Sequence, residues 1–124
     1  MILDTCALLF LASGDRRLSR GARERLASAA TRWYCAISSF EIALKLQGKL
    51  ELSSSPLRWL QALEERYSLS ELSLDSALCA AAARLPPHHR DPCDRFIIAA
   101  ALRLQVPVIT SDPKFAPYGV EVVS

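Results

Sequence analysis

The chain has 124 residues, of which 51% are hydrophobic and 23% are charged, and its formal net charge at pH 7 is +2. This length suits one domain with a substantial core, and the composition excludes disordered and fibrous proteins. No apolar run approaches the roughly 20 residues of a membrane helix, and the start lacks the basic and apolar regions of a signal peptide. We therefore expect a single domain over residues 1–124 in a soluble, cytoplasmic protein.

Short strand-like runs alternate with longer helical segments along the chain. The short runs are apolar or rich in strand formers, whereas the longer segments have polar caps and apolar residues at helical spacing. In chain order, the pattern predicts a strand at 1–3, helices at 6–11 and 20–30, a strand at 33–37, helices at 42–47 and 57–67, a strand at 71–74, helices at 76–85 and 92–104, and strands at 106–110 and 120–123. Such alternation needs crossover connections, so we expect an α/β fold with a largely parallel central sheet and helices on both faces.

Polar residues mark where several of these helices begin. Ser38 and Glu41 have the S-x-x-E spacing of a capping box, which predicts that the helix at 42–47 follows them. Asp75 is placed to cap the Ala-rich helix, and Asp91 takes the N-cap position of the helix at 92–104. Residues 96–102 of this last helix carry no charge, which indicates that it packs deeply against the sheet.

Acidic residues recur where a parallel sheet binds its ligands, beyond the carboxyl ends of the strands. Asp4 directly follows the first strand, Glu41 follows the second and Asp112 follows the strand at 106–110. Asp94 opens the last helix, with Asp91 as a candidate fifth acid. Each acid alone has a structural explanation as a turn residue or a helix cap. Together they predict a site at one edge of the sheet.

Gathered carboxylates have a chemical consequence. Two of them about 5 Å apart repel by roughly 3 kcal/mol at an effective dielectric of about 20. Several such pairs either raise pKa values sharply or require a counter-cation. Oxygen ligands without companion Cys or His favour Mg²⁺ or Mn²⁺ over zinc, and such an ion suits phosphoryl chemistry.

The remaining polar residues give weaker signals. The four cysteines form no C-x-x-C pair, so we expect free, mostly buried thiols: Cys6, Cys35, Cys79 and Cys93. His88 and His89 are neighbours in a Pro-rich loop and are expected to be solvated. Five arginines crowd one region and mark either a solvated helix face or a surface for a phosphate backbone: Arg16, Arg17, Arg20, Arg23 and Arg25.

Four segments closely resemble PIN domains, and most nearly the VapC-type toxins of toxin–antitoxin pairs: residues 3–9, 41–50, 91–101 and 109–115. The similarity covers essentially the whole chain in the right order. It implies a three-layer α/β/α PIN fold with a largely parallel central sheet. It also implies a ribonuclease that hydrolyses RNA phosphodiester bonds with Mg²⁺ or Mn²⁺.

The resemblance assigns roles to individual residues. The family's acidic quartet matches four positions: Asp4, Glu41, Asp94 and Asp112. Asp4 and Asp94 would be the leading metal ligands, and Asp112 a further ligand, direct or through water. Glu41 would ligate the metal or help activate the attacking water.

Three further positions are informative. Asp91 matches the extra acid in the Asp-Pro-x-Asp form of the motif and is a candidate metal ligand. Thr110 lies two residues before the last acid, where the family often has a hydroxyl that would hold a carboxylate or a water. Cys6 stands where close relatives often have His, and the first strand has fewer residues before Asp4 than is usual.

The resemblance also implies partners other than RNA. These are a small cognate antitoxin and either a homodimer or a hetero-oligomer with the antitoxin, without a membrane. The apolar segments at 40–46 and 57–63 either form a groove for an antitoxin helix or pack the core.

Other classes fit less well. A haloacid-dehalogenase-type phosphatase needs a second Asp two residues after its nucleophile, where Cys6 stands. A response-regulator receiver needs an acidic pair near the first strand, whereas Asp4 stands alone. The alternative to the enzyme is a catalytically silent PIN-like module that binds RNA or protein. Because no acid of the quartet is missing, the enzyme is preferred.

Overall fold

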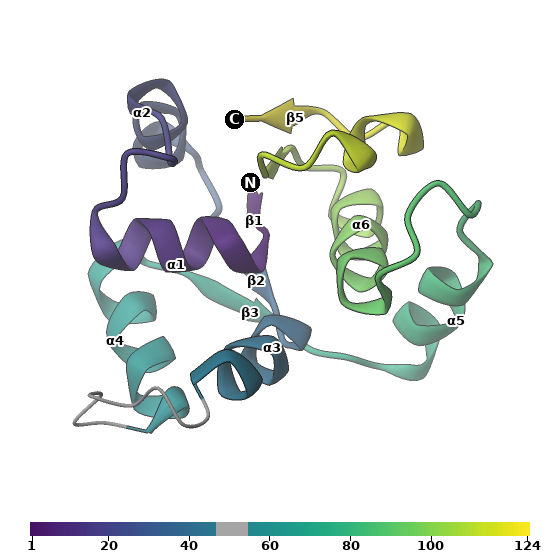
Figure 1. Ribbon diagram of the computed structural model, residues 1–124, viewed down its shortest axis with the longest axis horizontal. Coiled ribbons are helices and arrows are strands. Elements are labelled where there is room, and N and C mark those ends of the chain that lie inside the picture. The colour runs from purple at the N-terminus through teal and green to yellow at the C-terminus, as the bar shows by residue number, and fades with distance from the viewer. Residues whose placement is uncertain (47–54) are drawn as a thin grey trace.

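The computed structural model describes residues 1–46 and 55–124 (Figure 1). A five-stranded sheet lies at its centre, in the order β3-β2-β1-β4-β5, and every neighbouring pair is parallel. The strands are short: β1 (Ile2–Leu3), β2 (Trp33–Cys35), β3 (Ser70–Leu72), β4 (Val108–Ile109) and β5 (Val122–Val123). The predicted parallel sheet of an α/β/α fold is confirmed.

Helices connect the strands. They are α1 (Thr5–Ser13), α2 (Arg20–Ser28), α3 (Ile37–Leu46), α4 (Pro56–Tyr67), α5 (Ser76–Arg84), α6 (Pro92–Leu104) and the 3₁₀ helix η1 (Pro113–Tyr118). The predicted caps are confirmed at Asp75 and Asp91, and Ser19 caps α2 in the same way, because each side chain accepts a hydrogen bond from a backbone N–H in the first turn of its helix. Within the described part of the chain, no helix is both long enough and apolar enough to cross a membrane.

The predicted capping box is wrong. Helix α3 begins at Ile37, so Ser38 and Glu41 lie inside it rather than at its N-cap. Both side chains instead reach Thr5 of α1: the Ser38 and Thr5 hydroxyl oxygens are 2.9 Å apart, and the Thr5 hydroxyl donates to Glu41 Oε1 at 2.6 Å. A long-range contact therefore explains the spacing. The predicted end of this helix, at residue 47, lies outside the described residues.

The two faces of the sheet carry separate cores, because successive strand residues point to opposite sides. Leu3, Tyr34 and Ile109 pack with buried residues of α1, α2 and α4. On the other face, Ile2 and Val108 pack with α5, α6 and η1. Figure 1 shows α1, α2 and α4 on one side of the sheet and α5 and α6 on the other. Five consecutive residues of α6, from 97 to 101, are buried, which confirms its predicted deep packing.

The strand order reverses between β1 and β4, and we call the carboxyl edge of the sheet at this reversal the crevice. From β1 the chain proceeds outward to β2 and β3, and it then returns to place β4 on the opposite side of β1. The connections on either side of this point cover opposite faces, and doubly wound sheets bind their ligands at such a reversal. Asp4 directly follows β1, and Thr110 directly follows β4. These two residues therefore stand at the mouth of the crevice.

The thiols are free, as expected, but they are not mostly buried. Cys35 on β2 is buried, Cys93 is half-buried, and Cys6 and Cys79 are exposed. Cys6 lies in the first turn of α1 and Cys79 on α5. The expectation was wrong because helix rotation, which tertiary packing sets, decides which side chains face the core.

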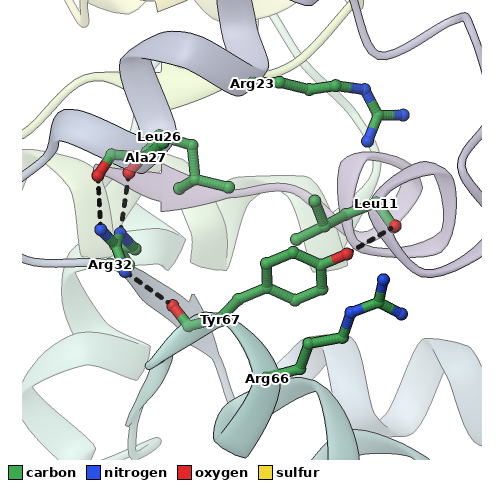
Figure 2. Close-up of a pocket in the computed structure, with 7 residues that line it drawn as sticks. All are labelled: Leu11, Arg23, Leu26, Ala27, Arg32, Arg66 and Tyr67. Carbon is green, nitrogen blue, oxygen red and sulfur yellow. Dashed lines mark hydrogen bonds between the residues drawn. The ribbon is translucent and has the colours of Figure 1, made fainter.

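Arg32 joins the ends of two helices at the amino edge of the sheet (Figure 2). Its guanidinium donates to the carbonyls of Leu26 at 2.7 Å and Ala27 at 2.6 Å, in the last turn of α2. It also donates to the carbonyl of Tyr67, the last residue of α4, at 3.0 Å. Helix C-termini leave carbonyls without helical partners, and a cation there is favourable. Beside Arg32 is a hollow of about 230 Å³, lined by Leu11, Arg23, Leu26, Ala27, Arg32, Arg66 and Tyr67.

We expect Arg32→Met to lower the free energy of unfolding by about 1–3 kcal/mol, because carbonyls at two helix ends lose their donors. The measurement is urea denaturation, with a lower midpoint and an unchanged slope. The matched control is Arg16→Met at an exposed position, with a change within about 0.5 kcal/mol. Equal losses from both variants would contradict a bridging role for Arg32.

Candidate functional site

Asp4 joins β1 to α1 at the mouth of the crevice. Its backbone is extended, and its side chain caps α1 by accepting the Ala7 N–H at 2.7 Å. The other carboxylate oxygen accepts the Thr110 hydroxyl at 2.5 Å, and the residue is only 6% exposed. Both oxygens of this buried acid are thus held by donors of the chain, which fixes their direction.

Thr110 links the acid after β1 to the acid after β4. While its hydroxyl donates to Asp4, the same oxygen accepts the backbone N–H of Asp112 at 3.0 Å. Asp112 in turn caps η1 by accepting the Lys114 N–H at 2.9 Å. The hydroxyl two residues before the last acid is therefore located between two acids of the quartet.

The tightest cluster in the crevice contains a residue that the sequence did not indicate. His89 Nε2 lies 2.8 Å from Asp112 Oδ2 and 3.0 Å from Asp94 Oδ2. Among residues 1–46 and 55–124, these three form the group of potential metal-ligand atoms that all lie within 4.8 Å of one another. The prediction of solvated histidines holds for His88, which is exposed, and is wrong for His89, which is 5% exposed.

Side chains of α6 and η1 hold the loop before α6 in place by hydrogen bonds to its backbone, and this explains the burial of His89. The Tyr118 hydroxyl accepts the His89 backbone N–H at 2.7 Å and donates to the Pro86 carbonyl at 2.6 Å. The guanidinium of Arg95 donates to backbone carbonyls of the loop and of the end of α5: Ala82, Ala83, Leu85, Pro86 and His89. The Phe115 ring packs edge-on against the imidazole, with ring centroids 5.7 Å apart.

Glu41 and Asp91 lie at the periphery of this cluster. Glu41 is half-buried on α3, and the hydroxyl of Thr5, next to Asp4, holds its carboxylate. Asp91 is exposed and caps α6 by accepting the Cys93 N–H at 2.9 Å. The structure thus brings Asp94 and Asp112 into direct contact with one imidazole, connects Asp4 to Asp112 through Thr110, and leaves Glu41 and Asp91 at the edge.

The electrostatics of Asp94 show that the acids act on one another. Burial raises the pKa of Asp94 to about 7, with the negative charges of Asp91, Glu41 and Asp4 acting in the same direction and His89 opposing them. This carboxyl group lies in the first turn of α6, where the helix dipole favours an anion. Burial and the neighbouring negative charges raise the pKa of Asp94 more than the helix dipole lowers it.

The pKa of Asp4 is also raised. Burial raises its pKa, the hydrogen bonds from Thr110 and Ala7 oppose this rise, and the charges of Glu41 and Asp112 add to it. Two acids of the crevice are therefore destabilised as anions. A divalent cation would relieve this repulsion, and carboxylate oxygens are the donor set that Mg²⁺ and Mn²⁺ prefer.

The arginine cluster is largely paired within the chain. Arg17 contacts Asp15 at 2.7 Å, Arg20 contacts Glu24 at 2.8 Å, and these pairs are solvent-exposed. Arg25 pairs with Glu121 at 2.8 Å. Such contacts reduce the charge available to a phosphate backbone, which favours the interpretation of a solvated helix face.

The fold and the acidic crevice define a three-layer α/β protein whose donor set suits a divalent cation. The sequence model of the PIN domain matches residues 1–120. The chain belongs to the PIN domain family.

Solved structures show the same fold at low sequence identity. VapBC2 from Rickettsia felis, bound to a promoter DNA fragment, contains a chain that is 15% identical, with a TM-score of 0.74 and coverage of 98% of this chain and 96% of that chain. DNA-bound VapBC from Salmonella typhimurium is 20% identical, with a TM-score of 0.69 and coverage of 98% of this chain and 95% of that chain. FitAcB from Neisseria gonorrhoeae is 20% identical, with a TM-score of 0.62 and coverage of 99% of this chain and 96% of that chain. No curated protein matches the sequence.

We expect Thr110→Val to weaken Mn²⁺ binding by about 10- to 100-fold, since the buried Asp4 carboxylate loses the donor that orients it. Thr110→Ser, which keeps the hydroxyl, is the matched control and should bind Mn²⁺ nearly as the wild type does. Isothermal titration calorimetry measures both. Wild-type affinity in the valine variant would show that this hydroxyl does not orient the site.

Proposed function

We propose that this protein is a VapC-type toxin, an endoribonuclease that hydrolyses RNA phosphodiester bonds with Mg²⁺ or Mn²⁺ and works in the cytoplasm. In this proposal, residues 1–124 act as one PIN domain. One observation carries it: the acids that match the family's quartet come from separate segments around one crevice, at the β1/β4 reversal of the sheet. They are Asp4, Glu41, Asp94 and Asp112.

Each acid has a role that follows from its place. Asp94 and Asp4 are proposed as leading ligands, because both are held at the crevice and both are destabilised as anions. Asp112 is a further ligand, direct or through water. A bound cation supplies stabilisation of charge on the phosphoryl group and a lowered pKa of its water. Glu41, at the less buried edge, ligates or helps to orient and activate the attacking water.

Asp91 is not one of the four proposed site acids, but its charge acts on them. Its carboxylate is occupied as the cap of α6, and its charge raises the pKa of Asp94. We therefore propose that it raises the attraction of the crevice for cations rather than acting as a principal ligand.

The test uses the purified chain with a pool of cellular RNA, with Mg²⁺, with Mn²⁺ and with excess chelator. Asp4→Asn should reduce metal-dependent cleavage by more than about 100-fold, beyond the usual effect of losing a residue that only supports a ligand. The amide keeps the shape of the side chain but not the charge. Glu24→Gln on α2 is the matched control, since it makes the same chemical change at an exposed ion pair.

Cleavage that needs metal and that only Asp4→Asn lacks would support the proposal. Equal cleavage by both variants would point to a contaminating nuclease. RNA binding without cleavage by the wild type would favour the catalytically silent module.

We also propose an antitoxin as partner, in a hetero-oligomer or beside a homodimer. The similar solved structures include VapBC and FitAcB, and the resemblance to VapC-type toxins implies a small antitoxin as partner. In this chain, adjacent helices expose large apolar side chains: Phe40 (56% exposed) and Leu44 (52%) on α3, and Leu57 (64%) on α4. Leu60 and Leu63 of α4 are buried in the core. The two apolar segments thus divide between core packing and an exposed patch suited to an amphipathic helix.

Leu44→Glu should weaken binding of the proposed antitoxin by at least about 10-fold, because a charge would enter an apolar contact. Leu74→Glu is the matched control, at a leucine that is 39% exposed between β3 and α5. Surface plasmon resonance measures both affinities. An equal effect of the two substitutions would remove the α3/α4 patch from the interface.

A further inference from the structure

We propose that His89 is a positioning residue whose Nε2–H donates to the Asp112 carboxylate and fixes it beside Asp94, and that it does not ligate the cation. This inference rests on the proposed metal-dependent function and specifies how its site is arranged. The observation behind it involves a residue outside the acidic quartet. One imidazole nitrogen of His89 lies between two carboxylates, one in the first turn of α6 and one at the N-cap of η1.

The neighbours of the ring assign its proton. His89 Nδ1 lies 3.2 Å from the backbone nitrogen of Asp91, which carries a hydrogen and acts only as a donor. Nδ1 must therefore accept this hydrogen bond. In the neutral ring the proton is then on Nε2, the nitrogen that faces the carboxylates.

This tautomer makes Nε2 the donor to Asp112. Nε2 lies 2.8 Å from Asp112 Oδ2, in a hydrogen bond, and 3.0 Å from Asp94 Oδ2, in a close polar contact. Asp94 comes from the first turn of α6, whereas Asp112 caps η1. The N–H between the two acids offsets part of their repulsion, and its hydrogen bond orients the Asp112 carboxylate beside Asp94.

A metal-ligating histidine has the opposite arrangement. It presents an unprotonated nitrogen to the metal and donates its other N–H to a carboxylate, a carbonyl or a water. Here the other nitrogen, Nδ1, faces a donor instead. For Nε2 to bind a cation, the proton would have to move to Nδ1, where it would confront the Asp91 N–H.

The ring is also held firmly enough to act in this way. The Tyr118 hydroxyl fixes the backbone of His89, Arg95 binds its carbonyl at 3.1 Å, and Phe115 packs edge-on against the imidazole. These contacts come from α6 and η1, the two helices that carry Asp94 and Asp112. The imidazole and the acids that it joins are therefore parts of one framework.

The first test compares two variants by Mn²⁺ titration calorimetry and by RNA cleavage. His89→Phe keeps a planar ring but removes the donor, and it should weaken Mn²⁺ binding by about 10- to 100-fold. His89→Gln places an amide N–H near the former Nε2 position and should restore most of this affinity and of kcat. Loss of affinity in both variants, at preserved metal-free melting temperature, would indicate a ligand and overturn the proposal.

The second test uses the wild type and so does not depend on a variant that folds. Long-range ¹H–¹⁵N correlation spectra of the imidazole, recorded without metal and with saturating Mg²⁺ where the ring is neutral, report which nitrogen carries the proton. The expected result is a proton on Nε2 in both spectra. Transfer of the proton to Nδ1 on addition of Mg²⁺ would overturn the positioning role.

Different results would overturn the proposed function and the positioning role of His89. A wild type that binds neither Mn²⁺ nor Mg²⁺ would overturn the proposed function and this inference with it. A wild type that binds Mn²⁺ no better than His89→Phe does would overturn only the inference.

Discussion

Repulsion between carboxylates is the constraint on which this structure depends. A parallel sheet directs the residues after its strands to one edge, and here Asp4 follows β1 directly and Asp112 follows β4 three residues later. The chain opposes the repulsion with donors from outside the acidic set: the Thr110 hydroxyl on Asp4, the Thr5 hydroxyl on Glu41, and the imidazole of His89 on Asp112, beside Asp94. Burial, together with the neighbouring negative charges, still raises the pKa values of Asp4 and Asp94. A site in this condition favours a divalent cation.

The acids serve the fold as well as the site. Asp4 caps α1, Asp112 caps η1, and Asp94 lies in the first turn of α6. The N-terminus of an α-helix carries a partial positive charge, so α1 and α6 bring two such charges to the crevice. The same side chains therefore begin the helices and gather at the reversal between β1 and β4. This double use explains why each acid, taken singly, has an adequate structural explanation.

Local patterns in the sequence were sufficient to predict the strands and most helices, because periodicity and capping are properties of neighbouring residues. Local patterns gave wrong predictions where contacts between residues far apart in the sequence determine the structure. The S-x-x-E spacing at Ser38 and Glu41 comes from contacts with Thr5, not from a cap. His89 differs from the exposed His88 only because Arg95 and Tyr118 tie down its loop. Nothing local to a Pro-Pro-His-His-Arg stretch shows which histidine turns inward.

The most direct test of the central claim, that the crevice is a divalent-metal centre, is a crystal structure with Mn²⁺ and anomalous diffraction. The account predicts an anomalous peak at the β1/β4 crevice, about 2.0–2.3 Å from carboxylate oxygens of Asp94 and of Asp4 or Asp112. His89 Nε2 would remain hydrogen-bonded to a carboxylate and outside the coordination shell. The absence of a peak at saturating Mn²⁺, or a peak elsewhere on the surface, would contradict the account.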